Sequence, residues 1–540
     1  MLERTGDAGA ASAADCDVLV VGAGFAGLYM LHELRGMGFR VRVLEAGSGI
    51  GGTWFWNRYP GARCDVESME YSYQFSPELQ QEWAWSERYA TQPEILRYIE
   101  HVAARFDLMR DIDLDTPVRA AHFDEAAALW RLETATGRQL SARFCVMATG
   151  CLSSPNTPQI AGLDSFAGAR YHTGHWPHEG VDFSGQRVGV IGTGSSAIQS
   201  IPIIAGQASG LVVFQRSPSY SIPAHNAPLD PARVSAIKAD YAAFRRRNRE
   251  MTFGVDFRAR SESALAATPE AREREYEARW ADGGLAFLGA YGDLLLDEDA
   301  NRTAAEFIRA KIRATVRDPA VAERLLPRQT VGCKRLCVDT DYFATFNRPN
   351  VTLVDLRETP IEAVTPAGVR TTARDHVLDS LVLATGFDAM TGALSKIDVR
   401  GRGGLTLAAK WADGPRTYLG LQIAGFPNLF TVTGPGSPSV LTNMLPSIEQ
   451  HVAWIAACIG HLRERALRTI EAAPAAEAAW VEHVNAVAGG TLYPHCSSWY
   501  LGANVPGKPR VFMPYIGFPP YVAKCEEVVA RGYEGFVLAA

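Results

Sequence analysis

The sequence contains little cysteine and no excess of positive charge. Its 540 residues include 9 cysteines, an odd and scattered set that predicts free thiols in a reducing compartment. Lys and Arg total 53 while Asp and Glu total 59, so the formal net charge is −6 and no strongly basic face is expected. The composition therefore argues against nucleic acid as a partner.

Signals for secretion or for membrane insertion are also missing. The N-terminal stretch carries Glu3, Arg4 and Asp7 and has no apolar segment, so it does not resemble a signal peptide. The longest uncharged run, residues 188–215, is long enough to span a bilayer, but five glycines and Pro202 interrupt it. We expect a cytoplasmic protein that has no membrane partner.

The rest of the composition is that of an ordinary globular protein. Hydrophobic residues make up 47% of the chain and charged residues 21%, which is close to the average for folded domains. At roughly 150 residues per domain, a chain of 540 residues is expected to form three to four domains or lobes. Such a chain is long enough to bury a large core.

A glycine-rich turn between a strand and a helix marks a first nucleotide site. A β-branched strand runs into the sequence GAGFAG, and an apolar helix follows it. In this pattern Gly22 makes the tight turn, Gly24 lets the backbone approach a pyrophosphate, and Gly27 lets the helix pack on the strand. The next strand ends at Glu45, which can accept hydrogen bonds from both ribose hydroxyls and disfavours a 2′-phosphate. The position of this glycine-rich turn near the N-terminus favours FAD as the ligand.

A second unit of the same kind lies further along the chain. A strand at residues 187–191 is followed by GTGSSA, in which alanine replaces the third glycine, a change that the pattern permits. The next strand ends at Gln215 and Arg216, with no carboxylate where the first unit has Glu45. An arginine at this place can pair with a ribose 2′-phosphate, so the second site is predicted to prefer NADPH to NADH.

Two later strands that both end in Ala-Thr-Gly predict that the chain crosses between the two nucleotide domains. We predict an α/β fold with two Rossmann-like dinucleotide-binding domains, one for FAD and one for NADP, and a helical insertion. The FAD-binding domain is expected at residues 1–150 and 387–540, the NADP-binding domain at 151–224 and 326–386, and the helical insertion at 225–325.

The predicted insertion differs in texture from the two nucleotide units. Ala, Arg and Glu recur at helical spacing, and glycine turns of the nucleotide type are missing. It also contains a cluster of positive charge, which we predict to be a solvated helix face and not a binding patch. The cluster consists of Arg245, Arg246, Arg247 and Arg249.

Two nucleotide sites of opposite ribose preference predict hydride transfer from NADPH to a bound flavin. A disulfide reductase of this architecture would need a redox-active cysteine pair with C-x-x-C or C-x-x-x-x-C spacing. The closest spacings, Cys333 to Cys337 and Cys145 to Cys151, do not fit that requirement. Dioxygen is therefore the expected electron acceptor.

Two motifs on either side of the first crossing make the sequence resemble the Baeyer-Villiger monooxygenases. One is GGTWFWNRYPGARCD at residues 51–65, and the other is F-x-G-x-x-x-H-x-x-x-W-P, which begins at Phe166. The final Trp-Pro separates this family from related flavin enzymes that oxygenate nitrogen or sulfur. The resemblance covers nearly the whole chain, including GPGSPSVLTNM from Gly434 and SWYLGANVPGKPR from Ser498. It is strongest for the phenylacetone and steroid monooxygenase subgroup.

The resemblance implies an enzyme that uses NADPH and O2 to convert aryl, cyclic or polycyclic ketones into esters or lactones, and sulfoxidation also fits. A C4a-peroxyflavin would attack the ketone carbonyl, and the tetrahedral Criegee-type adduct would rearrange. The peroxide must stay anionic, which requires a fixed positive charge. Arg335 matches the family's catalytic arginine, and Asp65 matches its acidic partner. Lys334 matches a second contact to the NADP phosphate, and Trp499 a loop residue that reaches NADP.

The patterns and the resemblance together give three sets of candidate binding residues, and no metal site is expected. For FAD they are Gly22, Gly24, Phe25, Gly27, Glu45, Gly52, Thr53, Trp54, Asp65, Tyr71 and Met444. For NADP they are Arg63, Gly192, Thr193, Gly194, Ser195, Ser196, Gln199, Arg216, Ser217, Lys334 and Trp499. For the substrate pocket they are Val66, Ser439, Val440 and Leu441.

Two other functions remain open at this stage. One is a flavin-dependent oxygenase of nitrogen or sulfur, which shares both nucleotide sites, and the other is a non-catalytic protein that senses redox state or nucleotides. The chain also departs from the family pattern at Cys333 and at residues 516–520, and both changes could reshape the pocket. His172 is expected to support the hinge between the lobes. We expect a monomer or a weak oligomer.

Overall fold

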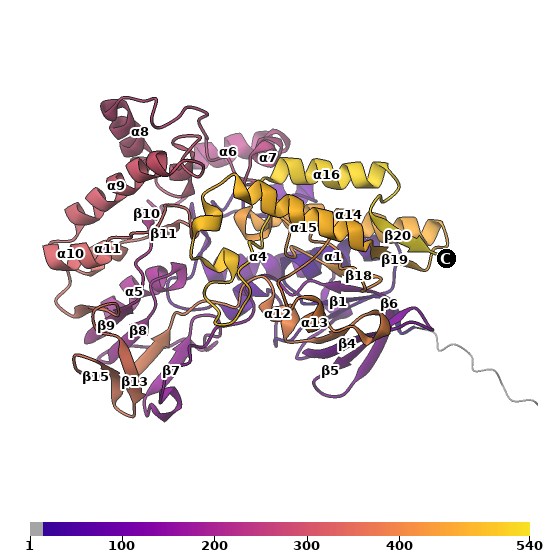
Figure 1. Cartoon of the computed structure of the whole chain (residues 1–540), viewed down its shortest axis with the longest axis horizontal. Helices are drawn as coiled ribbons and strands as arrows, with labels where there is room; N and C mark the ends of the chain where they lie inside the picture. The colour runs from indigo at the N-terminus through magenta and orange to yellow at the C-terminus, as the bar shows by residue number, and fades with distance from the viewer. Residues whose placement is uncertain (1–13) are drawn as a thin grey trace, which may run out of the picture.

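The computed structural model describes residues 14–540, which form two lobes that are each built on a β-sheet (Figure 1). Glu3, Arg4 and Asp7, used above against a signal peptide, lie outside the described residues. The first lobe contains an eight-stranded sheet. Its strand order is β17 (Asp398–Arg400), β4 (Val118–Asp124), β5 (Leu129–Thr134), β6 (Gln139–Met147), β1 (Cys16–Val21), β2 (Val41–Leu44) and β3 (Ile112–Asp113), with β18 (Leu429–Thr431) paired to β6.

The second lobe contains a five-stranded sheet in which every neighbouring pair is parallel. Both faces of such a sheet are normally covered, which explains why its three central strands are mostly apolar. The first sheet combines strands from before and after the second sheet in the chain. The predicted residue limits of the domains stay a prediction. The order in the second sheet is β12 (Val351–Asp355), β9 (Gly210–Gln215), β8 (Arg187–Ile191), β16 (Ser380–Leu383) and β7 (Ala169–His172).

Both lobes contain the same strand, turn and helix unit. Gly22 follows β1 with a φ of 104°, and a Cβ atom there would lie 2.6 Å from the carbonyl oxygen of Ala148. Gly192 follows β8 with a φ of 119°, and a Cβ atom there would lie 2.3 Å from the carbonyl oxygen of Ala384. Only glycine fits so tight a turn without strain. The helices that follow are α1 (Phe25–Gly36) and α5 (Ser195–Gln207).

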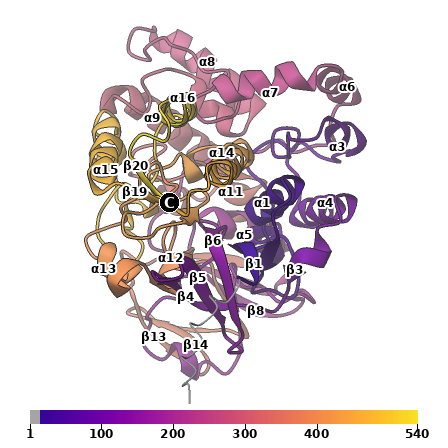
Figure 2. The same ribbon diagram turned by 90° about the vertical axis from the view of Figure 1, so that its right-hand side faces the viewer.

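The first lobe is completed by segments from the C-terminal part of the chain. The long helix α14 (Met444–Glu464) packs along α1, and the two lie side by side in Figure 2. Asn443 caps α14, because its side chain accepts a hydrogen bond of 3.2 Å from the Leu445 N–H. The other elements of this lobe are α2 (Thr53–Trp56), α3 (Pro77–Glu82), α4 (Gln92–Arg105), α12 (Gly392–Ser395), α13 (Leu407–Lys410), β19 (Thr469–Ala472), α15 (Pro474–Gly489), α16 (Phe518–Ala530) and β20 (Phe536–Ala539).

The predicted insertion is helical and occupies the upper left and top of Figure 1. It follows β10 (Ser221–Pro223), which pairs with β11 (Cys337–Asp339), and it thereby returns the chain to the second lobe. Its helices are α6 (Pro231–Ala239), α7 (Tyr241–Glu250), α8 (Pro269–Asp282), α9 (Glu298–Thr315) and α10 (Pro319–Leu325). The second lobe ends with α11 (Tyr342–Thr345) and the small sheet of β13 (Ile361–Thr365), β14 (Gly368–Thr371) and β15 (Asp375–Val377).

The prediction that the arginine cluster forms a solvated face is wrong for Arg245. That side chain is only 4% exposed, because α7 packs on the first lobe and turns Arg245 inward. Its Nη2 donates a 2.7 Å hydrogen bond to Ser72 Oγ, and its Nε donates a 3.0 Å bond to Gln80 Oε1. The guanidinium also lies over the Tyr241 ring at 4.9 Å. The other three arginines of the cluster, Arg246, Arg247 and Arg249, are exposed.

The prediction that all cysteines are free thiols is also wrong. Cys333 and Cys496 form a disulfide, with their Cα atoms 5.6 Å apart and a separation of 163 positions in sequence. A Cα distance of 5.6 Å lies in the usual range for a disulfide. Two cysteines so far apart in sequence form no recognisable motif, so the sequence alone does not predict that they pair. The other cysteines are buried free thiols.

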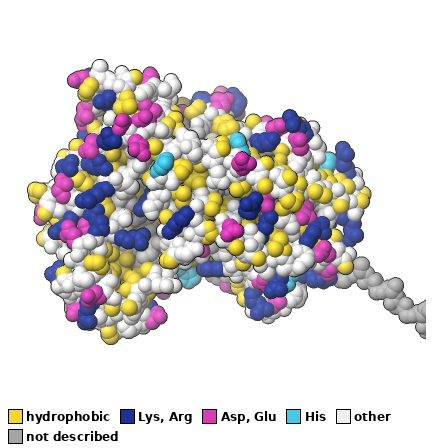
Figure 3. Space-filling view, in the orientation of Figure 1, with side chains coloured by type: hydrophobic (Ala, Val, Ile, Leu, Met, Phe, Trp, Pro, Cys, Tyr) yellow, Lys and Arg dark blue, Asp and Glu magenta, His cyan; other side chains and the backbone are white. Residues whose placement is uncertain are grey.

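The surface in Figure 3 carries positive and negative side chains intermixed over the visible face. Within residues 14–540, no helix is both long enough and apolar enough to cross a bilayer. The same residues contain no group of three or more His, Cys, Asp or Glu side chains that could hold a metal ion.

Candidate active site

Arg335 joins three segments that are far apart in the sequence. It lies in the turn that leads into β11, and its Nε and Nη2 donate hydrogen bonds of 2.5 and 2.8 Å to the two carboxylate oxygens of Asp65. Its Nη1 donates a 2.9 Å bond to the carbonyl oxygen of Val440, just before α14. A guanidinium has five N–H donors, so these three contacts fix its plane and leave two donors for a ligand.

The charge on Arg335 is permanent. Burial alone would lower the pKa of the guanidinium, but the neighbouring Asp65 carboxylate outweighs that effect and raises the pKa above its usual value. The Arg335 side chain keeps 25% of its surface exposed and Asp65 keeps 21%, so one edge of the pair remains open. The structure therefore presents an oriented positive charge to any ligand at this edge.

Apolar and aromatic side chains form a wall beside Arg335, since Val440, whose carbonyl oxygen accepts a bond from Arg335, belongs to it. Tyr493 and Tyr500 are both buried, and burial raises the pKa of each phenol. The positive charge of Arg335 opposes this rise at both, which places them near the guanidinium. Such a wall limits access of water to the guanidinium and suits an apolar ligand. The cluster also contains Cys151, Ala389, Met390, Val440, Leu441, Leu501, Phe512 and Met513.

Ser439 and Val66, two of the predicted pocket residues, are both buried. Ser439 is committed to internal contacts, since its hydroxyl donates a 3.0 Å hydrogen bond to the carbonyl oxygen of Thr433. Val66 directly follows Asp65, and belongs to the core of the first lobe. The structure therefore places Val440 and Leu441 on the wall beside Arg335 and holds Ser439 inside the supporting turn.

The first nucleotide turn lies at the N-terminus of α1. Glu45 is buried and accepts hydrogen bonds of 2.6 Å from the Ala23 N–H and 2.8 Å from the Gly47 N–H. Burial raises the pKa of Glu45, and the two N–H groups oppose that rise. Gly24 and Gly52 face each other, because a Cβ atom on Gly52 would lie 3.0 Å from the Gly24 Cα. The bare backbone at this place fits a pyrophosphate, so the turn fits FAD.

Aromatic residues continue the site beyond that turn. Trp54 Nε1 donates a 3.0 Å hydrogen bond to the Tyr71 hydroxyl, and the Tyr71 ring meets Phe25 edge to face at 5.6 Å. Thr53 begins α2 and Met444 begins α14. Gly27 permits the close packing expected of it, since a Cβ atom there would lie 1.8 Å from the Gly22 carbonyl oxygen.

The second nucleotide turn is tied to both lobes. Thr193 Oγ1 donates a 2.9 Å hydrogen bond to the carbonyl oxygen of Ser217, at the end of β9. Gln199 Nε2 donates a 3.1 Å bond to the carbonyl oxygen of Arg63, which belongs to the first lobe. The remaining predicted residues lie at the start of α5: Gly192, Gly194, Ser195, whose hydroxyl is 3.4 Å from Cys337 Sγ, and Ser196, whose hydroxyl is 3.2 Å from Thr173 Oγ1.

Two positive side chains come together at the end of β9. Arg216 is exposed, and Lys334 is half-buried near it. Burial lowers the pKa of Lys334 and the positive charge of Arg216 lowers it further, while no carboxylate contributes. Two cations held together without a counter-ion in the described part of the chain make a site that fits a phosphate.

The comparisons with known proteins agree with this arrangement. A family model described as pyridine nucleotide-disulphide oxidoreductase matches residues 19–222. A Baeyer-Villiger monooxygenase of Pseudooceanicola batsensis is 42% identical over 529 residues, which cover 97% of this chain and 96% of the relative. The chain belongs to the Baeyer-Villiger monooxygenase family.

Two other similarities place this Baeyer-Villiger monooxygenase more closely. A solved structure of oxidised steroid monooxygenase bound to NADP is 56% identical, with a TM-score of 0.93 and coverage of 97% of this chain and 99% of that one. A phenazine N-monooxygenase of Lysobacter antibioticus is 42% identical over 527 residues, covering 97% of each chain. The predicted family and the predicted α/β fold with two dinucleotide-binding domains are confirmed. The roles of individual residues stay predictions.

Sequence reasoning missed several residues of this Baeyer-Villiger monooxygenase site. Tyr493 and Tyr500 face Arg335, yet a buried tyrosine leaves no signal in the sequence beyond the nearby Trp499. Trp499 is half-buried and its ring lies 4.3 Å from that of Tyr500. His172 has a structural setting, since Nδ1 accepts a 3.0 Å hydrogen bond from the Gly174 N–H.

Proposed function

We propose that this Baeyer-Villiger monooxygenase uses FAD, NADPH and O2 to convert ketones into esters or lactones. The observation that carries the proposal is the oriented guanidinium of Arg335, which Asp65 holds with two donors free and which lies beside an apolar wall. The names of the similar enzymes support the reaction class. We also propose that the protein is cytoplasmic and works as a monomer or a weak oligomer.

The two glycine turns provide the cofactor sites in this proposal. The turn at Gly22 and Gly24, with Glu45 on the ribose, would hold FAD, and the turn at Gly192 would hold NADPH. Arg216 and Lys334 would bind the 2′-phosphate that distinguishes NADPH from NADH. When bound, the two cofactors supply the electrons and activate the oxygen.

The chain's own residues orient the ketone and exclude water. The two free N–H donors of Arg335 would stabilise the negative charge that builds on the carbonyl oxygen during attack. Asp65 keeps the guanidinium in one plane, so that these donors keep their direction. The aromatic and aliphatic wall around Arg335 supports an aryl, cyclic or polycyclic ketone as the substrate class.

A two-stage experiment tests the proposal. The protein with FAD is reduced by NADPH without oxygen, then exposed to O2 with a panel of aryl and cyclic ketones, and the products are identified by mass spectrometry. We expect flavin bleaching in the first stage and a product heavier than the ketone by one oxygen atom in the second. Bleaching and NADPH consumption with no ester or lactone from any ketone would remove the proposal.

A second candidate function is supported by one comparison. The phenazine N-monooxygenase is as similar to this chain as the Baeyer-Villiger monooxygenase from Pseudooceanicola batsensis, at 42% identity. Oxygenation of an aromatic nitrogen or of a sulfur atom needs both nucleotide sites but does not need a charge aimed at a carbonyl oxygen. Arg335→Ala separates the two functions: ester formation should stop, whereas oxidation of a sulfide or of an aromatic nitrogen should continue.

A further inference from the structure

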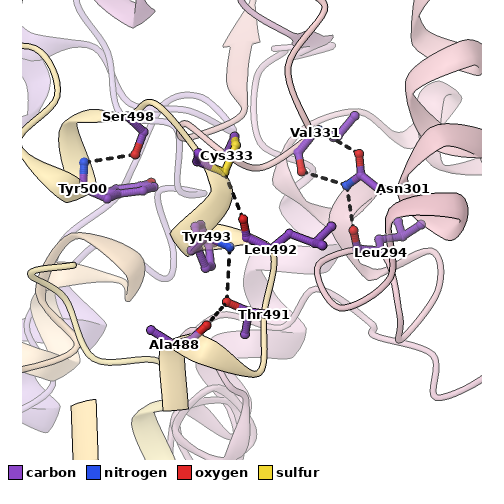
Figure 4. The surroundings of a disulfide bond; sticks show 11 residues. Leu294, Asn301, Val331, Cys333, Ala488, Thr491, Leu492, Tyr493, Ser498 and Tyr500 are labelled. Atoms are coloured by element: carbon purple, nitrogen blue, oxygen red, sulfur yellow. Dashed lines mark hydrogen bonds between the residues drawn. A yellow bond between two sulfur atoms is a disulfide. The ribbon is translucent and has the colours of Figure 1, made fainter. Parts of the chain in front are cut away.

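The disulfide between Cys333 and Cys496 lies near Tyr493 and Tyr500, two tyrosines of the candidate active site (Figure 4). Cys333 directly precedes Lys334 and Arg335 in the chain. Cys496 belongs to a segment, residues 490–513, that we call the cap because it supplies Tyr493, Trp499, Tyr500, Phe512 and Met513 to the wall around Arg335. The bond therefore links the backbone next to the candidate catalytic arginine to the segment that lies beside it.

The Cys333 end of the bond is anchored in the insertion. Asn301 on α9 is 3% exposed and its Nδ2 donates hydrogen bonds of 2.6 Å to the Leu294 carbonyl and 3.0 Å to the Val331 carbonyl (Figure 4). Its Oδ1 accepts a 2.9 Å bond from the Val331 N–H. Because two of these three bonds hold the backbone of Val331, two residues before Cys333, the covalent link starts from a fixed point.

The cap is fixed at its other end by polar contacts. Lys508 Nζ lies 2.5 Å from Asp388 Oδ1, and Asn504 Nδ2 donates a 2.6 Å hydrogen bond to the Phe387 carbonyl. Trp499 and Tyr500 lie between these contacts and the disulfide, and their backbone hydrogen bonds stay within the cap. The Tyr500 N–H donates a 3.2 Å bond to Ser498 Oγ, and the Tyr500 carbonyl accepts a 3.0 Å bond from the Met513 N–H. Without the disulfide, the near end of the cap would be held by apolar packing and by a 3.0 Å hydrogen bond from the Leu492 N–H to the Leu295 carbonyl.

We propose that the Cys333–Cys496 disulfide is a positioning element that holds the cap closed over Arg335, and that reduction of this bond loosens the cap. The inference rests on the proposed function only for its effect on turnover. A closed cap keeps water from the reacting centre, so loosening it should divert electrons to hydrogen peroxide instead of product.

Formation of the bond uses an oxidant that the proposed reaction can release, hydrogen peroxide, and its reduction uses an external thiol. Formation of the bond takes two thiols to a disulfide, and one hydrogen peroxide accepts the two electrons and two protons and becomes two water molecules. Reduction needs two external thiols: the first thiolate attacks one sulfur and releases the other cysteine as a thiolate, and the second attacks the mixed disulfide, which leaves two cysteine thiols and an external disulfide. Cys333 is buried whereas Cys496 is half-buried, so Cys496 is the accessible sulfur. Peroxide released by a loose cap would therefore restore the bond and close the cap.

A mass measurement tests whether the bond forms. Holoenzyme prepared without reductant, treated with hydrogen peroxide and alkylated in denaturant should carry seven modified cysteines, because nine minus the bonded pair leaves seven. After reduction all nine should be modified, and the peptides that contain Cys333 and Cys496 should separate. Nine modified cysteines in the oxidised sample would overturn the proposal.

A second measurement tests what the bond does. Limited proteolysis within the cap should be on the order of tenfold faster in reduced wild type and in Cys496→Ser than in oxidised wild type. The peroxide released per NADPH should rise about threefold in the same samples, and dithiothreitol should change the wild type but not Cys496→Ser. Cys458→Ala, which removes a buried thiol in α14, serves as the matched control and should keep the wild-type response.

Two outcomes separate this proposal from the proposed function. If proteolysis depends on the bond but no ketone gives an ester, the cap role stands and the proposed function fails. If oxidised and reduced wild type are cleaved at the same rate and release the same peroxide, the bond has no positioning role, whatever the substrate is.

Discussion

Replacement of Asp65 by asparagine isolates the orientation of Arg335 from its charge. Asparagine has nearly the same shape as aspartate, but it offers one acceptor where the carboxylate offers two. The carboxylate accepts bonds of 2.5 and 2.8 Å from Nε and Nη2, so one of these contacts would become a clash between two donors. Arg335 would keep its charge and its bond to the Val440 carbonyl and lose its fixed plane.

The structure allows the size of the effect to be worked out. A hydrogen bond to a charged group contributes about 1.5–3 kcal/mol, so the loss of one contact leaves the guanidinium free to tilt. Misplacing a donor that stabilises the developing charge costs roughly 2.7–4 kcal/mol, which is about 100- to 1000-fold in rate. We expect kcat for ester formation to fall by about 100-fold in Asp65→Asn, near the lower limit because the bond to Val440 and one bond to residue 65 remain.

The assay separates binding, reduction and oxygenation. Stopped-flow reduction by NADPH should stay within about threefold of wild type in Asp65→Asn, because the change lies in the oxygenation step. Arg335→Lys is the matched variant, since it keeps the charge but lacks the planar fork, and it should lose activity at least as strongly. If Asp65→Asn forms ester at the wild-type rate while Arg335→Ala forms none, charge alone suffices and the argument from orientation is wrong.

Three further predictions concern charged residues outside that pair. Arg216→Ala should lower kcat/KM for NADPH by about 10- to 100-fold and change that for NADH by less than about twofold; equal losses would exclude a contact to the 2′-phosphate. The pKa of Lys334 is lowered below the usual 10.5, and only the protonated amine attracts phosphate. NADPH affinity measured by titration calorimetry should therefore weaken as the pH rises through that pKa, and Lys334→Met should remove this pH dependence. Arg245→Met should destabilise the fold by about 3 kcal/mol in denaturant unfolding, whereas the exposed Arg246→Met should change stability by less than about 0.5 kcal/mol.

The features that could be predicted from the sequence are those set by local chemistry. Both glycine turns were found because a positive φ and a close carbonyl oxygen leave no other residue possible at Gly22 and Gly192. Glu45 and Arg216, which stand at the ends of the two following strands, could be predicted because opposite charges at this place favour different ribose groups. The pairing of Arg335 with Asp65 came only from the resemblance to a family, because 270 positions separate the two residues.

The two errors have a common physical origin. A run of arginines indicates charge but not the direction in which a helix turns it, so Arg245 was placed in solvent. The signal was present nonetheless: Tyr241, Phe244, Arg245 and Asn248 recur at helical spacing and are the buried residues of α7. Cys333 and Cys496 gave no such signal, since a disulfide depends on where two distant segments meet.

Three consecutive residues connect the separate parts of the site. Cys333 forms the disulfide to the cap, and Lys334 lies near Arg216. Arg335 donates two hydrogen bonds to the Asp65 carboxylate. Their side chains act in different places, but they share one short stretch of backbone, and Asn301 holds the start of it through Val331. Residues that share a support do not act independently, and coupling energies between such neighbours are about 0.5–3 kcal/mol. A disturbance of the cap should therefore be felt both at the phosphate and at the guanidinium, even though the disulfide touches neither.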